Sequence, residues 1–300
     1  MNGSAWNATR EMQAQFCRDG YVVIRGAFDA AQMSAMSAAF DSAVASALAK
    51  KGTTLAELER GGTAIRDGVD IVAGSGRWTH GGLPQRDPRY VLEHALLDNP
   101  ELERVATDSR LLAMVSALLG RSAQLNGSDG HVFYGDTGWH PDAGWAPRLR
   151  EFAPENVSLR IAIYLDPVLA DSGCLRAIDG SHRSPLHDRL AEAWTTQRSS
   201  TDLGPSDATA EPDPTFERNE ASLGFAVPQC RLLETEPGDI VLFESNIWHG
   251  AFTQDKATPR RMIGLDYGIA DLERVNDWAK WREATLDGVA AGSAIDTPKL

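Results

Sequence analysis

The spacing of hydrophobic positions along the chain changes near residue 120, which divides the sequence into two parts. In the first part, apolar side chains recur every three to four residues, as on one face of an amphipathic helix. Residues 30–50 show this spacing most clearly and predict a long helix whose apolar stripe packs into a core. The stripe consists of Met33, Met36, Phe40, Val44 and Leu48.

Shorter elements surround this helix. Residues 21–25 are mostly β-branched or aromatic and predict a strand. Asn99 is a helix-capping residue followed by a proline and an acid, so one helix is expected over residues 99–119. The remaining pattern predicts helices over residues 11–18, 54–61 and 88–97, a strand over 69–72 and a polar loop over 74–86.

After residue 120, apolar and polar positions alternate in short runs separated by turn residues, which is the period of a strand. Helices first and many short strands afterwards predict a mainly β protein with flanking helices, whose core is an antiparallel sandwich or barrel. The predicted strands cover residues 123–128, 131–134, 138–142, 158–165, 174–177, 230–234, 239–244 and 260–267.

One domain over residues 1–300 accommodates these elements, because a chain of this length without a long linker suits one large core. Its helical part covers residues 1–120 and its β core covers residues 121–270. Residues 181–227 are rich in Ser, Thr, Asp and Pro, and their length predicts a lid that orders over bound substrate. Residues 271–300 predict a closing helix and a frayed tail.

The composition narrows the function classes. A net charge of −13 and a pI near 5.0 repel nucleic acid and anionic membrane surfaces. No apolar stretch approaches the roughly 18 residues of a transmembrane helix. Cys17, Cys174 and Cys230 fit no zinc motif and predict free thiols in a reducing compartment. We expect a cytoplasmic protein that acts on a small molecule, with its oligomeric state, a homo-oligomer included, left open.

A histidine and a carboxylate, His140 and Asp142, lie two positions apart in one predicted strand. Residues at this spacing point to the same side of a strand, so both can bind one ion. Two histidines and one carboxylate form a non-haem Fe(II) site, and His249 is the best candidate for the second histidine. The alternatives are a surface turn around His140 and a hydrogen-bonded structural histidine at His249.

Two adjacent arginines begin the last predicted strand, eleven residues after His249. Neighbouring strand residues face opposite sides, so only one arginine can point into the core. Arg260 shares its side with Met262 and Gly264, which leave room for a ligand. Arg261 shares its side with apolar residues that suit packing against helices. Arg260 is therefore predicted to point inward, where a buried guanidinium needs an anion such as a carboxylate.

Five short motifs occur in a fixed order along the chain. They are Asp-Gly-Tyr-Val-Val-Ile at residues 19–24, Trp-His-Pro-Asp at 139–142, Gly-Cys-Leu to Gly-Ser-His at 173–182, Pro-Gly-Asp to His-Gly at 237–250, and Arg260. Together they resemble the phytanoyl-CoA dioxygenase family of Fe(II)- and 2-oxoglutarate-dependent oxygenases, over about residues 12–270.

This resemblance implies a double-stranded β-helix, the jelly-roll core of cupin-like proteins. It implies that His140, Asp142 and His249 bind Fe(II), and that Arg260 binds the distal carboxylate of 2-oxoglutarate. O2 is then the second co-substrate, and a small molecule is oxidised while 2-oxoglutarate becomes succinate and CO2. Related halogenases lack the carboxylate ligand, so Asp142 favours hydroxylation.

The chain departs from the family pattern at two places. Ala251 stands where relatives often have a serine that contacts 2-oxoglutarate, and alanine has no hydroxyl group for that contact. Ile178 and Asp179 replace a residue pair that usually includes proline, which alters a turn. His182 in the same motif resembles a histidine that is structural in relatives, and it is left out of the metal site.

Further residues are assigned to the site by their position in the chain. Asn126 and Ser128 precede the metal motif in a predicted strand, and Thr137 lies just before His140, so they are expected near 2-oxoglutarate or substrate. An aromatic or charged rim suits a polar or anionic substrate, although each rim residue fits a packing or surface role equally well. The rim candidates are Trp78, His80, Trp145 and Arg148.

Three other functions compete with hydroxylation. A catalytically silent jelly-roll binding protein would need a broken triad, whereas all three ligands are present here. A cupin-like metal isomerase or sugar-binding enzyme would lack the eleven-residue spacing from His249 to Arg260. A 2-oxoglutarate oxygenase of natural-product biosynthesis that catalyses desaturation, demethylation or ring rearrangement would share every ligand.

Overall fold

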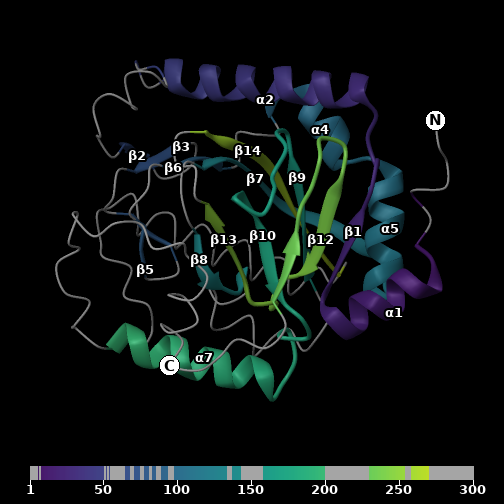
Figure 1. Ribbon diagram of the computed structural model, residues 1–300. Coiled ribbons are helices and arrows are strands. Elements are labelled where there is room, and N and C mark those ends of the chain that lie inside the picture. Colours follow the sequence, from purple (N-terminus) through teal and green to yellow (C-terminus); the bar gives the residue numbers. More distant parts are fainter. Residues whose placement is uncertain are drawn as a thin grey trace.

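Two antiparallel sheets lie at the centre of the computed structural model (Figure 1). The structure describes residues 6, 8–50, 52, 54, 98–133, 137–142, 158–199, 230–253 and 258–269, and it describes five strands between residues 65 and 93 by their backbone alone.

The larger sheet contains eight strands, each antiparallel to its neighbours. In spatial order the strands are β1 (Tyr21–Ile24), β12 (Ile240–Glu244), β9 (Ser158–Tyr164), β14 (Arg260–Ile269), β7 (Ala123–Phe133), β6 (Arg89–Glu93), β3 (Ile71–Gly74) and β2 (Ile65–Asp67). One of its faces turns toward helices and the other toward the second sheet, so β12, β9 and β14 bury apolar side chains on both of their faces.

The smaller sheet contains four strands and packs against the first through an apolar layer that includes Tyr164, Leu175 and Phe243. Its spatial order is β11 (Cys230–Leu233), β10 (Ser172–Ile178), β13 (His249–Thr253) and β8 (Thr137–His140). A separate ribbon pairs β4 (Trp78–His80) with β5 (Leu83–Gln85). Two facing antiparallel sheets with flanking helices confirm the predicted jelly-roll class.

Helices cover the outer faces of both sheets (Figure 1). The large sheet packs against α1 (Arg10–Asp19), α2 (Ala30–Lys50), α4 (Pro100–Ala106) and α5 (Ser109–Leu119). The predicted stripe on α2 faces this core, and Met36 and Phe40 are almost fully buried. On the opposite side, Leu190 of α7 (Leu186–Ser199) joins Trp139 and Trp248 in the core of the smaller sheet.

Three sequence predictions need correction. The single helix over 99–119 is two helices, because Asp108 caps α5 by accepting from the backbone N–H of Arg110 at 2.8 Å. The helix predicted over 88–97 is wrong: Arg89–Glu93 is strand β6, whose five residues pair with β7. The polar loop over 74–86 contains the ribbon β4–β5.

The two strands predicted over residues 123–128 and 131–134 form one continuous strand, β7. The structure also contains strand β13, which was not predicted from the sequence. The start of the predicted lid contains α7, while residues 200–227 of that lid lie outside the described residues. The helix predicted over 54–61 and the closing helix and tail over 271–300 also fall outside them. In the described part of the chain, no helix is long and apolar enough to cross a membrane.

Candidate metal centre and adjoining pocket

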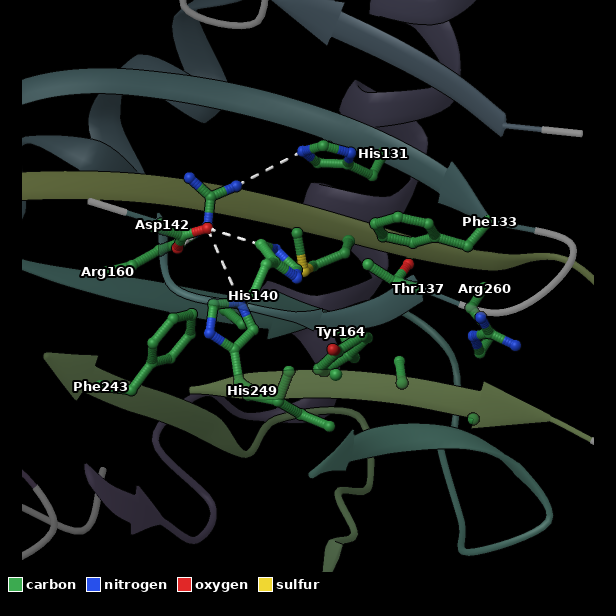
Figure 2. A pocket seen from close by; sticks show the side chains of 16 residues that line it. His131, Phe133, Thr137, His140, Asp142, Arg160, Tyr164, Phe243, His249 and Arg260 are labelled. Carbon is green, nitrogen blue, oxygen red and sulfur yellow. Dashed lines mark hydrogen bonds and ion pairs between the residues drawn. The ribbon is translucent and has the colours of Figure 1, made fainter. Parts of the chain in front are cut away.

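A pocket of about 540 Å³, part of which is open to solvent, lies between the two sheets. Its wall combines side chains from β7, β9, β12 and β14 of the larger sheet with side chains from β8, β10 and β13 of the smaller one. Charged and imidazole groups gather toward one end of the pocket, and one arginine, Arg260, lies toward the other (Figure 2).

His140, Asp142 and His249 converge in this pocket (Figure 2). Asp142 Oδ1 lies 3.7 Å from His140 Nε2 and 3.6 Å from His249 Nε2, and one ligand atom from each residue lies within 4.8 Å of the others. His140 ends β8 and His249 begins β13, where the two are directly opposite each other. Three donors this close can hold one divalent ion.

The sequence argument for Asp142 requires a correction. The predicted strand over 138–142 ends at His140, and Asp142 follows in a turn after Pro141. Its carboxylate meets the histidines because of this turn, and strand alternation does not explain the convergence. Pairing of β8 with β13 supplies the second imidazole.

A hydrogen bond orients the His249 ring. Its Nδ1 lies 3.0 Å from the backbone carbonyl of Ile247, which can only accept, so Nδ1 carries the proton. With the proton on Nδ1, Nε2 points toward Asp142 and His140 and is the nitrogen that is available to a metal. Both histidines are buried, and their ring centroids lie 4.3 Å apart. This tautomer is the one that binds a metal through Nε2.

Asp142 is suited to remain ionised. Burial raises the pKa of its carboxyl group, but the positive charges of His249, in its protonated form, and of Arg160 outweigh burial and hold the pKa below its usual value. Two imidazole nitrogens and one carboxylate oxygen therefore face the same point. This donor set fits Fe(II) and related divalent ions, and it leaves further coordination positions to small ligands.

Arg260 forms the other end of the pocket and is 2% exposed. One of its guanidinium nitrogens donates to the backbone carbonyl of Ser172 at 3.0 Å. Gly173 makes room for it, because a Cβ at this glycine would lie 2.4 Å from the guanidinium. Arg261 faces the opposite side of β14 and pairs with Asp166 at 2.7 Å and with Asp41 at 2.9 Å.

Thr137 brings a hydroxyl group to the pocket wall. Its side chain is buried, and its Oγ1 has no hydrogen-bond partner among the described residues. Thr137 lies on β8 directly opposite Ala251 of β13. A hydroxyl group is therefore present across from the alanine that replaces the serine expected by resemblance.

Comparisons with known proteins identify the family. A sequence model of the family described as phytanoyl-CoA dioxygenase (PhyH) matches residues 16–262. The chain belongs to this family. A comparison with curated protein sequences gave no match. The predicted family is thus confirmed over most of the chain, from α1 to the start of β14.

Solved structures share the fold of this PhyH-family protein at low sequence identity. The 2-oxoglutarate-dependent epimerase SnoN from nogalamycin biosynthesis is 18% identical, with 87% of this chain and 82% of that chain covered and a TM-score of 0.53. EctD from S. alaskensis, crystallised with 2-oxoglutarate and 5-hydroxyectoine, is 21% identical, with 90% and 78% covered and a TM-score of 0.52. The carbocyclase SnoK is 18% identical, with 89% and 86% covered and a TM-score of 0.53.

Two further predicted site residues of the PhyH-family protein, Asn126 and Ser128, are not part of the pocket wall. Asn126 is absent from the pocket wall, and its Oδ1 accepts a hydrogen bond from Gln124 at 3.3 Å. Ser128 lies opposite Leu265, which belongs to the core under the helices, so it faces away from the pocket. Trp78 and His80 are in β4, which is described by its backbone alone, and Trp145 and Arg148 lie outside the described residues.

Sequence reasoning missed an ionic cluster beside the metal centre: Arg160 with Asp129, His131 and Asp266. Burial, opposed by Arg160 and reinforced by Asp129, raises the pKa of Asp266 to about 6. The sequence contained one indication of this cluster. Arg160 is the one charged residue in the otherwise apolar strand β9, and its position faces the same side as Ala162 and Tyr164 of the pocket wall.

His182 is buried outside the pocket and makes stability depend on pH. Burial, followed by the charge of Arg183, lowers the pKa of His182 to about 4, from an unfolded value of 6.5. Between these values the unfolded chain binds a proton that the folded protein does not, so stability should fall as the pH drops from 6.5 to 4. The loss at pH 4 approaches about 3 kcal/mol, at about 1.4 kcal/mol for each pKa unit.

Denaturant unfolding of the wild type and of His182→Gln at pH 7 and pH 4.5 measures this effect. The variant should be less stable than the wild type at pH 7, and the difference should shrink at pH 4.5. If the free energy of unfolding changed with pH in the same way in both proteins, His182 would not be the source of the pH dependence.

Proposed function

We propose that this PhyH-family protein is an Fe(II)- and 2-oxoglutarate-dependent oxygenase that hydroxylates a small molecule. One observation carries the proposal: two histidines and a carboxylate meet in a pocket whose other end holds a buried arginine. A small molecule that binds the metal through a keto acid group and carries a second carboxylate at its other end would fit this arrangement. 2-Oxoglutarate has these groups, and the structurally similar EctD was crystallised with it.

The residues of the pocket have separable tasks in this proposal. His140, Asp142 and His249 bind the iron, while Arg260 holds the distal carboxylate of 2-oxoglutarate through parallel hydrogen bonds. The Thr137 hydroxyl donates a further hydrogen bond to the same co-substrate. Arg160, His131 and Tyr164 also line the pocket and have no task in this proposal.

Iron and 2-oxoglutarate, when bound, supply the oxidation: O2 and 2-oxoglutarate give succinate and CO2, and the second oxygen atom enters a substrate C–H bond as a hydroxyl group. The chain supplies position and shielding. Apolar side chains such as Leu175, Met262 and Phe133 line the space between the triad and Arg260, and they exclude water from it.

Hydroxylation is favoured over halogenation because Asp142 supplies the third protein ligand that halogenases lack. The structurally similar proteins nevertheless include an epimerase and a carbocyclase. A different 2-oxoglutarate-dependent oxidation, such as desaturation, demethylation or ring rearrangement, is therefore the second candidate. The polar or anionic nature of the substrate, the single-domain boundaries 1–300 and the cytoplasmic location stay predictions.

Succinate release tests the proposed function. The purified protein, loaded anaerobically with Fe(II), is given 2-oxoglutarate, O2 and members of a metabolite library. A substrate should increase succinate formation and gain one oxygen atom, which mass spectrometry detects with ¹⁸O2. A product of unchanged oxygen content would favour the second candidate. No succinate with any compound and no binding of Fe(II) or 2-oxoglutarate would leave only a silent binding protein.

The Thr137 hydroxyl predicts a specific loss of affinity. Thr137→Val keeps the shape of the side chain and removes the hydroxyl, so the apparent KM for 2-oxoglutarate should rise about ten-fold, since a hydrogen bond to a charged group contributes about 1.5 kcal/mol or more. Thr235→Val is the matched control, because Thr235 is also buried with an unpartnered hydroxyl but lies outside the pocket. Equal KM changes in both variants would contradict the assignment.

A further inference from the structure

A second arginine, Arg160, lies next to Asp142, at the end of the pocket away from Arg260 (Figure 2). Its side chain is only 11% exposed. The proposed chemistry assigns it no task, although a charged group this close to a metal ligand must affect the ligand. Its contacts show what the effect is.

Arg160 is fixed from three directions. One terminal nitrogen contacts both oxygens of Asp266, at 2.9 and 3.1 Å. The other terminal nitrogen donates to Asp129 Oδ1 at 2.5 Å and lies 3.3 Å from His131 Nε2. Strand register explains this convergence, because Asp266 is directly opposite Arg160, while Asp129 is on the strand beyond, opposite Gly264. The guanidinium therefore has one well-defined position.

Gly264 provides the space for that position. A Cβ at Gly264 would lie 2.3 Å from a terminal nitrogen of Arg160 and 2.2 Å from Asp129 Oδ1. The sequence suggested that this glycine leaves room for a ligand, and the structure corrects that interpretation: the room is taken by Arg160 and Asp129. Any side chain at Gly264 would push the guanidinium away from its partners.

Because the guanidinium is fixed, the two oxygens of Asp142 have different neighbours. Oδ1 faces both histidines, at 3.7 and 3.6 Å, whereas Oδ2 faces Arg160 Nε at 3.7 Å. Oδ2 is buried and has no hydrogen-bond partner in the described part of the chain, so the Arg160 charge is its main neighbour. A carboxylate held in this way can bind a metal through one oxygen, while its other oxygen points away from the metal and toward Arg160.

We propose that Arg160 is a positioning residue that restricts Asp142 to metal binding through one oxygen, and that Asp129, Asp266 and Gly264 act by fixing Arg160. The proposal rests on the proposed function in one respect, namely that the triad binds a divalent metal. A carboxylate that binds through both oxygens occupies one more coordination position. Arg160 therefore keeps one coordination position of the metal free for the co-substrates.

This role predicts opposite changes in two affinities. A cation beside a divalent metal opposes metal binding by charge repulsion, and Arg160 also withholds one carboxylate oxygen. Loss of the arginine contact should leave the affinity for metal unchanged or higher. The affinity of the metal-loaded protein for 2-oxoglutarate should fall by at least about ten-fold, a loss of about 1.4 kcal/mol, because Asp142 then occupies a coordination position that the co-substrates need. A merely structural arginine would lower both affinities.

The experiment uses Mn(II) as the metal probe, and the titrations are done without O2 so that no turnover can occur. Titrations measure Mn(II) affinity and then 2-oxoglutarate affinity of the Mn(II)-loaded protein, for the wild type, Arg160→Met, Arg160→Lys and Gly264→Ala. Gly264→Ala is the sharpest variant, because it displaces the guanidinium and keeps its charge, so a change cannot come from lost charge alone. Arg160→Lys should recover only part of the 2-oxoglutarate affinity, since an ammonium cannot contact the three partners together.

Arg261→Met is the matched control: it removes an arginine with two carboxylate partners from the opposite face of β14. It should change neither affinity. A crystal structure of Mn(II)-loaded Gly264→Ala should show both oxygens of Asp142 on the metal, whereas the wild type should show one.

The outcomes separate this inference from the proposed function. Retained Mn(II) affinity with weakened 2-oxoglutarate binding in Gly264→Ala and Arg160→Met supports the positioning role. Parallel loss of both affinities, or one-oxygen binding by Asp142 in the Gly264→Ala crystal, overturns it while the metal centre stands. Absence of Mn(II) binding in the wild type would instead overturn the proposed function.

Discussion

Replacing His140 or His249 by alanine is expected to abolish iron binding and, with it, all turnover of 2-oxoglutarate. Each imidazole is one of three donors within 4.8 Å of one another, and no other described histidine, cysteine or acid joins the group. Even outer partners of metal ligands contribute about 10–100-fold to affinity, so loss of a ligand should exceed that range. Metal content after anaerobic loading with Fe(II) and gel filtration measures the effect.

Two further variants complete this experiment. Asp142→Ala should also weaken iron binding and end hydroxylation, because it removes the single anionic donor of the triad. His187→Gln is the matched control, since His187 is equally buried and is held by the backbone carbonyl of Ser181, away from the pocket. Wild-type iron content in His140→Ala or His249→Ala, with the control also unchanged, would mean that the triad is misassigned.

Replacing Arg260 by alanine should raise the apparent KM for 2-oxoglutarate by at least about 10–100-fold. Hydrogen bonds to a charged group contribute about 1.5–3 kcal/mol each, and about 1.4 kcal/mol corresponds to a factor of ten. Iron content should hardly change, because Arg260 lies at the other end of the pocket from the triad (Figure 2). Arg260→Lys should recover part of the loss, since an ammonium cannot reproduce two parallel hydrogen bonds.

The neighbouring residue supplies the control for Arg260. Arg261→Ala removes a guanidinium of the same strand that pairs with Asp41 and Asp166 on the opposite face. Its KM for 2-oxoglutarate should stay near the wild-type value, and at most the stability should fall. A large KM change in Arg261→Ala together with none in Arg260→Ala would contradict the assigned faces of β14.

Several features follow from the sequence alone, because their causes are local. The apolar stripe on residues 30–50 has the period of a helix, and α2 buries it. Arg260 and Arg261 face opposite sides because adjacent strand residues must do so, and the pocket wall contains only the first. The break at Asp108 also has a local cause, since a capping residue inside an apolar run can begin a new helix.

Other features depend on contacts between segments far apart in the chain. Residues 89–93 have no strong preference of their own and become a strand because β7 offers them a row of backbone hydrogen-bonding groups. Asp142 reaches the histidines through a turn whose direction no periodicity encodes.

The family, the change from helices to strands and the three residues of the candidate metal centre can be predicted from the sequence, because they depend on short motifs and on periods of a few residues. The way in which Asp142 is held depends instead on contacts between strands. Arg160, Asp129, Asp266 and Gly264 come from three strands, and they meet only when β7, β14 and β9 pair in the observed register. A shift of one residue would turn these side chains to the other face of the sheet, so their meeting is a property of the register and is invisible in any single strand.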